Sequence, residues 1–362
     1  MQSRDTTLRL LARVMELKPH ETKETLSLNE ARNYIIALSK PMGEAVDLIN
    51  GNLEEIKRKR KEVEAFEDDI KGFQAQLKFS GFELEVEKLD YPMTVCTAEG
   101  CTTYENIGET RVRNTIYSQV CHSPCGLRVP CQTTNNAELR GCAAMSGERC
   151  MKCSHDYRVH MHIYYKATKR PKEFLSKETQ KLIKEKKDLK SQKEAFVAEL
   201  EKDIKELNDE KDFIYECASI FGVFLKENAL IPYNDSFADY LDMLIKEEEC
   251  KEKKIRDVKK IERMKREKKT YEEKKQVIMG NLASSEGSNH EVISADIHER
   301  KDKLCSLRRN GKSLKSALGT LILLISTCAF SFNFLYPWQK RKRDVILCVK
   351  MTCDVSSRSI LK

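Results

Sequence analysis

The chain has 362 residues, of which 34% are charged and 7% aromatic, with only 14 Gly and 8 Pro. Lys, Glu, Leu and Ile dominate long stretches, which is typical of long helices rather than of a large α/β enzyme or a β sandwich. The 65 basic residues stand against 57 acidic ones, so the net charge of +8 comes from a mixed surface. We therefore expect a mainly α protein with no specific nucleic-acid partner.

The N-terminal part of the chain predicts helices. Two short helices are expected in residues 1–40, and Ser27 with Glu30 forms a capping pair at the start of the second. Pro41 is expected to begin a long helix over 41–79, because proline is tolerated in a first turn. The apolar residues of this helix recur at steps of three and four and form a narrow stripe that needs a partner helix. The stripe consists of Met42, Val46, Ile49, Leu53, Ile56, Val63, Ile70 and Leu77.

Residues 80–165 differ from the rest, because the helical period disappears and Cys, Gly, Thr and Tyr become frequent. The alternating runs 82–86 and 160–165 predict strands. Of the 14 cysteines, eight lie between Cys96 and Cys153, and four of the seven histidines lie between His122 and His162. The N-terminus shows no secretory signal, so we expect a cytoplasmic protein whose thiols stay reduced. A dense Cys/His cluster in that setting predicts a zinc-binding module.

The module offers enough ligands for two zinc ions, each held by four Cys or His side chains. The candidate ligands are Cys96, Cys101, Cys121, His122, Cys125, Cys142, Cys150, Cys153, His160 and His162. Cys131 and His155 are set aside as non-ligands. In one division the earlier ligands hold one ion and the later ligands the other: Cys96, Cys101 and Cys125 with Cys121 or His122, then Cys142, Cys150 and Cys153 with His160 or His162. An interleaved division fits the spacing equally well. Because closed four-ligand sites are easily filled here, we expect a structural role and no catalytic residues.

Helical periodicity resumes after the module. Over 166–246 large apolar residues recur at seven-residue intervals, first from Leu175 to Phe196 and then from Leu200 through Ile214 to Phe221, and an apolar bundle segment follows. The similar lengths of the two periodic arms predict a long antiparallel, coiled-coil-like hairpin with the β-containing Cys/His zinc module at its tip. The apolar seams of such a hairpin are expected to bind a protein partner or a second copy of the chain.

The C-terminal part divides by composition. A highly charged helix is expected over 247–280 and a polar linker over 281–316. Residues 317–338 form an apolar run flanked by basic residues, and this run is long enough to span a bilayer. Three interpretations stay open for it: a membrane anchor, a buried or interfacial helix, and a gene-model artefact. Residues 339–362 form a basic tail.

Several segments of the chain resemble a known family. They are Leu10–Met15, Thr25–Arg32 and Ala37–Pro41 before the module, and Val95-Cys96, Cys121-His122-x2-Cys125, Cys150-x2-Cys153 and His160–Ile163 within it. These segments are similar to the helical, Cys/His-rich region that follows the GTPase domain in AIG-type and septin-like G-domain proteins of invertebrates and fungi. The resemblance covers residues 8–250 and implies a GTPase-associated region without an assigned activity. No phosphate-binding loop of a GTPase is found in this sequence, so no GTP hydrolysis is expected.

The sequence thus predicts a non-enzymatic, zinc-stabilised helical module for interaction or regulation. A ring-finger ubiquitin ligase is an alternative, because such ligases also use eight Cys/His ligands for two zinc ions. Their opening pair is normally separated by two residues, whereas four separate Cys96 from Cys101. A membrane-anchored coiled-coil scaffold is a further alternative and depends on residues 317–338.

Overall fold

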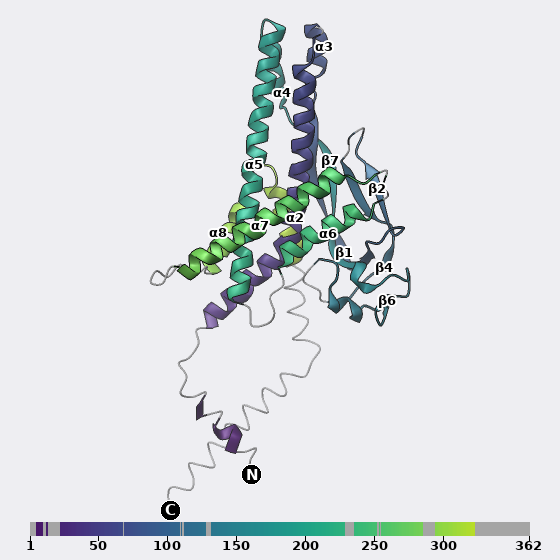
Figure 1. The fold of residues 1–362 in the computed structure, drawn as a ribbon, viewed down its shortest axis with the longest axis vertical. Coiled ribbons are helices and arrows are strands. Elements are labelled where there is room, and N and C mark those ends of the chain that lie inside the picture. Colours follow the sequence, from purple (N-terminus) through teal and green to yellow (C-terminus); the bar gives the residue numbers. More distant parts are fainter. Residues whose placement is uncertain are drawn as a thin grey trace, which may run out of the picture.

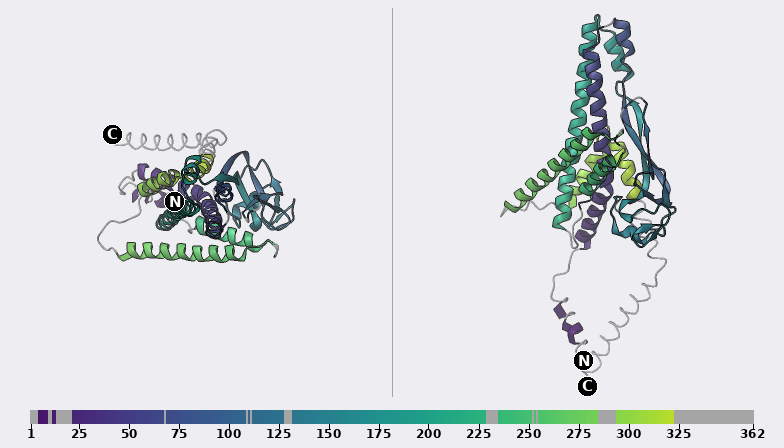
Figure 2. Two further views of the ribbon diagram at one scale, coloured as in Figure 1. Left: turned by 90° about the horizontal axis from the view of Figure 1, so that it is seen from above. Right: turned by 45° about the vertical axis from the view of Figure 1, so that its right-hand side comes forward.

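The computed structural model describes residues 5–9, 12–13, 22–67, 69–108, 110, 112–127, 132–228, 235–251, 253, 255–284 and 294–322. Two long helices dominate it, α2 (Thr22–Glu64) and α5 (Leu189–Glu227), and they lie side by side (Figure 1). A small β-rich module flanks α2, and further helices pack around the lower half of the pair (Figure 2). The prediction of a mainly helical fold with a small β-containing module is confirmed.

Contacts along α2 and α5 show that the two helices are antiparallel. Arg60 Nη1 lies 3.2 Å from Glu201 Oε1, and further down the pair Lys211 Nζ lies 3.3 Å from Asn50 Oδ1. The α2 part of the predicted stripe is buried in one core with Phe196, Leu200 and Leu207 of α5; its members are Met42, Val46, Ile49, Leu53, Ile56 and Val63. Each such side chain contributes roughly 1.5–3 kcal/mol by leaving water. The stripe that was expected to face a partner is therefore covered by the same chain.

The boundaries of α2 differ from the expected ones. Pro41 lies inside the helix rather than at its start, so the second short helix and the long helix are one element. An interior proline costs about 3 kcal/mol, and the fully buried side chains of Leu38 and Met42 on either side of it offset that cost. At its other end α2 stops at Glu64. A separate short helix, α3 (Ile70–Ala75), follows Asp69, whose carboxylate accepts a hydrogen bond from Gly72 N at 2.8 Å.

A long two-stranded ribbon carries the chain into the β-rich module. Strands β1 (Ser80–Cys96) and β7 (His160–Glu173) pair antiparallel, with Ser80 opposite Glu173 and Cys96 opposite His160. Strand β4 (Val120–His122) pairs with the other edge of β1. Two hairpins complete the module: β2 (Thr102–Asn106) with β3 (Arg113–Tyr117), and β5 (Met145–Ser146) with β6 (Arg149–Cys150). The two predicted strands are confirmed, since they lie within β1 and β7.

The ribbon folds back along α2, so the module lies beside the helix pair (Figure 1). The side chain of Asn52 on α2 donates to Phe82 O at 2.9 Å and accepts from Phe82 N at 2.8 Å. Lower on α2, Glu44 accepts a hydrogen bond from the Tyr165 hydroxyl at 2.8 Å. The predicted position of the module at the tip of the hairpin is therefore wrong. The tip is formed by α3 and by α4 (Lys177–Lys184). Helix α4 lies in the chain between the end of β7 at Glu173 and the start of α5.

Asp47 of α2 links three elements. Its carboxylate lies 2.6 Å from Lys169 Nζ on β7 and 2.7 Å from Lys260 Nζ on α7 (Val258–Ser284). Burial alone would raise the pKa of Asp47, but the two ammonium groups outweigh burial and hold that pKa well below its usual range. The module is thus attached to the helices by charge as well as by packing.

The helices after α5 correct the expected C-terminal organisation. Helix α6 (Ser236–Glu249) starts at Asp235, whose carboxylate accepts a hydrogen bond from Ala238 N at 3.1 Å. Helix α7 covers most of the charged segment. The predicted linker 281–316 is wrong over 294–316, because α8 (Ser294–Cys305) and the helical residues 311–322 lie there. Their side chains Ile297, Leu304 and Leu314 are buried in the main core.

Residues 317–322 are the described part of the apolar run 317–338. They are helical, and Ala317, Leu318 and Leu321 are buried in the main core. Within the described part of the chain, no helix has the length and apolar character that a bilayer span requires. The rest of the run and the basic tail 339–362 lie outside the described residues.

Candidate metal centre

Ten Cys and His side chains of the module converge in three groups, in each of which all potential ligand atoms lie within 4.8 Å of one another. Site A consists of Cys96, Cys101, Cys153 and His155; site B of Cys121, Cys150, Cys153 and His160; and site C of His122, Cys125 and Cys142. The groups are interleaved along the chain, as in the second of the two expected divisions. Cys153 belongs to both site A and site B.

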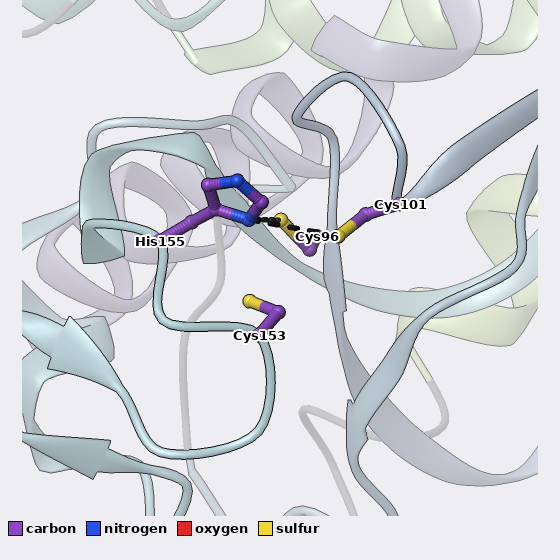
Figure 3. Close-up of side chains that lie close together, drawn as sticks. All are labelled: Cys96, Cys101, Cys153 and His155. Atoms are coloured by element: carbon purple, nitrogen blue, oxygen red, sulfur yellow. Dashed lines mark hydrogen bonds between the residues drawn. The ribbon is translucent and has the colours of Figure 1, made fainter.

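Site A joins the end of β1 to the turn that follows β6 (Figure 3). The chain reverses between Cys96 and Cys101 through Gly100, whose φ of +82° suits glycine. His155 Nδ1 lies 3.6 Å from Cys96 Sγ and 3.5 Å from Cys101 Sγ. Figure 3 shows Cys153 pointing toward the same space from the loop that also carries His155. His155, which the sequence analysis set aside as a non-ligand, is therefore part of this group.

Site B is built on the tight turn 150–155. Cys150 N donates to His155 O at 2.8 Å, and Ser154 N donates to Cys150 O at 2.9 Å, which closes the turn. Within it Lys152 N lies 3.4 Å from Cys150 Sγ, a position from which a backbone amide could donate to a thiolate. Cys153 Sγ lies 3.7 Å from Cys121 Sγ on β4. The turn thus presents two thiols to a third from a different strand.

His160 is oriented toward site B by its second ring nitrogen. His160 Nδ1 lies 2.8 Å from Asp156 O, and Nε2 lies 3.2 Å from Cys153 Sγ. A carbonyl oxygen can only accept, so Nδ1 carries the proton and Nε2 presents its lone pair to the thiols. This backbone partner is the support that metal-binding histidines usually have.

Site C lies where β4 approaches a short 3-10 helix, η1 (Ala137–Gly141), which Cys142 terminates as its C-cap. His122 Nδ1 lies 3.3 Å from Cys142 Sγ, and Cys142 Sγ lies 3.8 Å from Cys125 Sγ. The Thr94 hydroxyl of β1 lies 3.4 Å from Cys125 Sγ and 3.5 Å from Cys142 Sγ. Thr94 is a partner that the sequence analysis missed, because a lone threonine in a strand carries no signal for this role.

His162 is the one predicted ligand in the described residues that none of the three groups includes. It is fully buried, its Nδ1 lies 3.5 Å from Thr94 Oγ1, and its ring packs edge-on against Tyr164. Its Nε2 has no hydrogen-bond partner among the described residues. Cys131 lies outside the described residues, so its exclusion as a ligand stays a prediction.

The distances within the groups match those of a tetrahedral zinc site. Zn–S bonds of about 2.3 Å and Zn–N bonds of about 2.0 Å imply S···S edges of about 3.8 Å and S···N edges of about 3.5 Å. The S···S separations cited above are 3.7 and 3.8 Å, and the S···N separations run from 3.2 to 3.6 Å. The backbone therefore holds these donors at the spacing that a tetrahedral ion requires.

Burial and neighbouring groups shift the pKa values within the module. Burial raises the pKa of the Cys96 thiol. The hydrogen bond between Cys142 and Cys125 lowers the pKa of Cys125 to about 6 and raises that of Cys142 to about 12. Burial lowers the pKa of His160, and it lowers that of His162 to about 4. Both imidazoles are thus neutral at pH 7, which is the form that binds metals.

The β1–β7 ribbon lies between the three Cys/His groups and the helices. Side chains alternate along a strand, so His160 and His162 project from one face of β7, while Met161 and Ile163 project from the other. Met161 and Ile163 pack in one cluster with Tyr240 of α6. The same strand therefore contributes to the metal groups and docks the module on the helical body.

The module has a small apolar core of its own. Apart from seven buried or half-buried cysteines, the cluster at the centre of the module contains mainly Leu139, Ala144, Met145 and Tyr157. A core of this size supplies little hydrophobic stabilisation, and natural domains of this kind depend on metals or disulfides. None of the cysteines in the described residues forms a disulfide.

A family model described as a domain of unknown function (DUF8206) matches residues 88–166. The match contains all the residues of sites A, B and C and the half of the β1–β7 ribbon nearest to them, so it coincides with the metal-ligand part of the module. No curated protein and no solved structure matches the chain.

Proposed function

We propose that the β-rich module is a zinc-stabilised structural unit. The observation that carries this proposal is the convergence of ten Cys and His side chains in three groups, with ligand atoms within 4.8 Å of one another, in a module with little apolar core. Mixed thiolate and imidazole donors in tetrahedral arrangement favour zinc over magnesium or calcium, which prefer oxygen ligands. The zinc ions would take the place of the core that the module lacks.

A structural role for the metal is supported by the number of donors. Sites A and B each contain four N or S donors when the shared Cys153 is counted in both, and four such donors would fill a tetrahedral zinc ion and leave no position for a substrate or an activated water. The donors also come from distant parts of the chain, so an ion in site A would cross-link β1 to the 150–155 turn, and an ion in site B would cross-link β4 to that turn. We therefore propose a non-enzymatic module whose shape depends on metal.

The helices would present this module as an interaction or regulatory unit. The apolar stripe of α2 is used within the chain, so a partner would contact other surfaces. Of the eight large apolar side chains exposed in the described residues, four belong to the module: Tyr91, Ile116, Val120 and Met151. This concentration supports a protein partner for the module. The link to a G-domain protein is a proposal that rests on the resemblance described under Sequence analysis.

Metal content and its effect on folding test the proposal. The full chain would be purified without added metal, and its zinc content would be measured by elemental analysis alongside its mass under native conditions. We expect bound zinc, and we expect chelation to abolish protection from hydrogen exchange over 88–166. A protein that contains no metal and is nevertheless folded in this region would refute the proposal.

A further inference from the structure

Site C has three donors among the described residues, whereas a closed zinc site has four. The register of the ribbon points to a fourth. His162 on β7 is directly opposite Thr94 on β1. The Thr94 hydroxyl contacts both thiols of site C, and His162 Nδ1 lies 3.5 Å from that same hydroxyl. The Thr94 hydroxyl therefore contacts both His162 and the two thiols of site C, which places His162 next to that site.

One ring nitrogen of His162 makes no polar interaction with the described residues. Its side chain is 0% exposed, and its Nε2 makes no hydrogen bond to any described residue. An unpaired polar atom in a protein interior destabilises the fold, because its hydrogen bonds to water are lost and not replaced. The other histidines of the module all direct a ring nitrogen at a thiol: His122 at Cys142, His155 at Cys96, and His160 at Cys153. Binding a metal ion would give His162, the fourth histidine of the module, a partner for its Nε2 atom.

Sites A and B also have too few donors if each donor binds only one ion, because the two sites share Cys153. If Cys153 belonged to one of them alone, the other would be left with three donors. A thiolate sulfur has lone pairs for two metal ions, so a bridging Cys153 gives each site four ligands. Cys153 Sγ lies within 4.8 Å of the other ligand atoms of both groups, and His160 Nε2 of site B is 3.2 Å away from it.

We propose that the module holds three zinc ions, two of them bridged by Cys153 Sγ in sites A and B, and the third in site C with His162 Nε2 as its fourth ligand. Eleven side chains then fill twelve coordination positions. This inference rests on the proposed function, since it takes the metal to be zinc, and it adds the number of ions and their connectivity. Zinc ions bridged by one sulfur would lie about 4 Å apart.

Zinc stoichiometry of the full chain tests the third ion. We expect three zinc ions per chain by native mass spectrometry and elemental analysis, and two in His162→Gln. The control His298→Gln, which changes a histidine on α8 outside the module, should keep three. Wild-type protein with two ions, or a His162→Gln variant that keeps three, would overturn the proposal. So would loss of the third ion in Cys131→Ser, because Cys131 would then be the fourth ligand.

Spectroscopy of the wild-type chain keeps the test valid if His162→Gln does not fold. In cadmium-113 protein with nitrogen-15 histidine, we expect three cadmium resonances. Two should be coupled to each other through Cys153, and the third should be coupled to His162 Nε2. Absence of either coupling would refute the corresponding bond. These results differ from failure of the proposed function itself, which would appear as folded wild-type protein without any bound metal.

Discussion

Replacing Asp47 by Asn tests whether charge holds the module to the helices. The substitution keeps the shape of the side chain but removes its charge, and it leaves Lys169 and Lys260 without their closest carboxylate, at 2.6 and 2.7 Å. The Asp47 side chain is 13% exposed and its partners 15% and 23%. Breaking a fully buried pair costs about 3–5 kcal/mol and an exposed one about 0–1 kcal/mol. We expect about 3 kcal/mol for this site, near the lower end of the buried range.

The measurement is urea unfolding of wild type, Asp47→Asn, Lys260→Met and the double variant, in zinc-containing buffer at neutral pH. The double-mutant cycle isolates the coupling between the two side chains, which we expect to exceed about 1 kcal/mol. Glu85→Gln is a matched control, because it breaks the exposed pair with Arg170 across the same ribbon and should cost less than about 1 kcal/mol. A cost for Asp47→Asn as small as that of the control would refute the reasoning.

The pH dependence of this effect has a definite sign. The pKa of folded Asp47 lies below its usual range, so its stabilising contribution is present above the unfolded pKa of about 4 and is lost as the pH falls through the folded value. The stability difference between wild type and Asp47→Asn should therefore stay constant from about pH 8 to about pH 5. A difference that shrinks within that interval would mean that Asp47 titrates there, against this account.

Three further predictions concern packing, hydrogen bonding and metal. A Cβ on Gly43 of α2 would lie 2.3 Å from Tyr240 Cδ1, so Gly43→Ala should destabilise by about 1–3 kcal/mol in urea unfolding. The control Gly319→Ala, at an exposed helical position with no atom within 4 Å of the new Cβ, should instead stabilise by about 0.5–1 kcal/mol. If the two substitutions changed the free energy of unfolding equally, Gly43 would not be packed against Tyr240 as described. Asn52→Ala should cost about 2 kcal/mol by leaving the Phe82 backbone unpaired, with faster hydrogen exchange of the Phe82 amide as its signature. Chelation should remove the hydrogen-exchange protection of the module's amides, while amides in the middle of α2 and α5 keep theirs, because the core between these helices contains no metal ligand. Loss of protection in the helices as well as in the module would contradict this prediction.

Periodicity and residue chemistry predict much of this structure. The apolar stripe from Met42 to Val63 is buried as the three-and-four spacing indicates, and alternation locates the strands that start and end the module. The clustering of Cys and His predicts where ligand groups occur. These are local signals, because each depends on residues close together in the sequence.

The missed features depend on contacts between distant residues. Nothing near Pro41 reveals that burial of its neighbours outweighs the cost of an interior proline. The position of the module beside α2 depends on pairs such as Asn52 with Phe82, which no periodic pattern encodes. His155 joins site A because the tight turn 150–155 brings it back toward β1, although the spacing Cys150-x2-Cys153-x-His155 offered a signal. In α8 the buried Ile297 and Leu304 stand seven residues apart, a helical signal obscured by the polar composition around it.

The pairing of Ser80 with Glu173 has a consequence for how such a chain can diversify. The two points where the polypeptide leaves and rejoins the helical scaffold are adjacent, so everything between them is an insertion with neighbouring ends. Insertions of this kind can lengthen, shorten or be exchanged without moving the segments on either side, since the gap to be closed stays one strand spacing wide. The family match at 88–166 falls wholly inside this insertion. Residues of the insertion that do not contact the helices can thus change without moving the scaffold, whereas residues such as Lys169 and Met161 remain tied to it by their contacts.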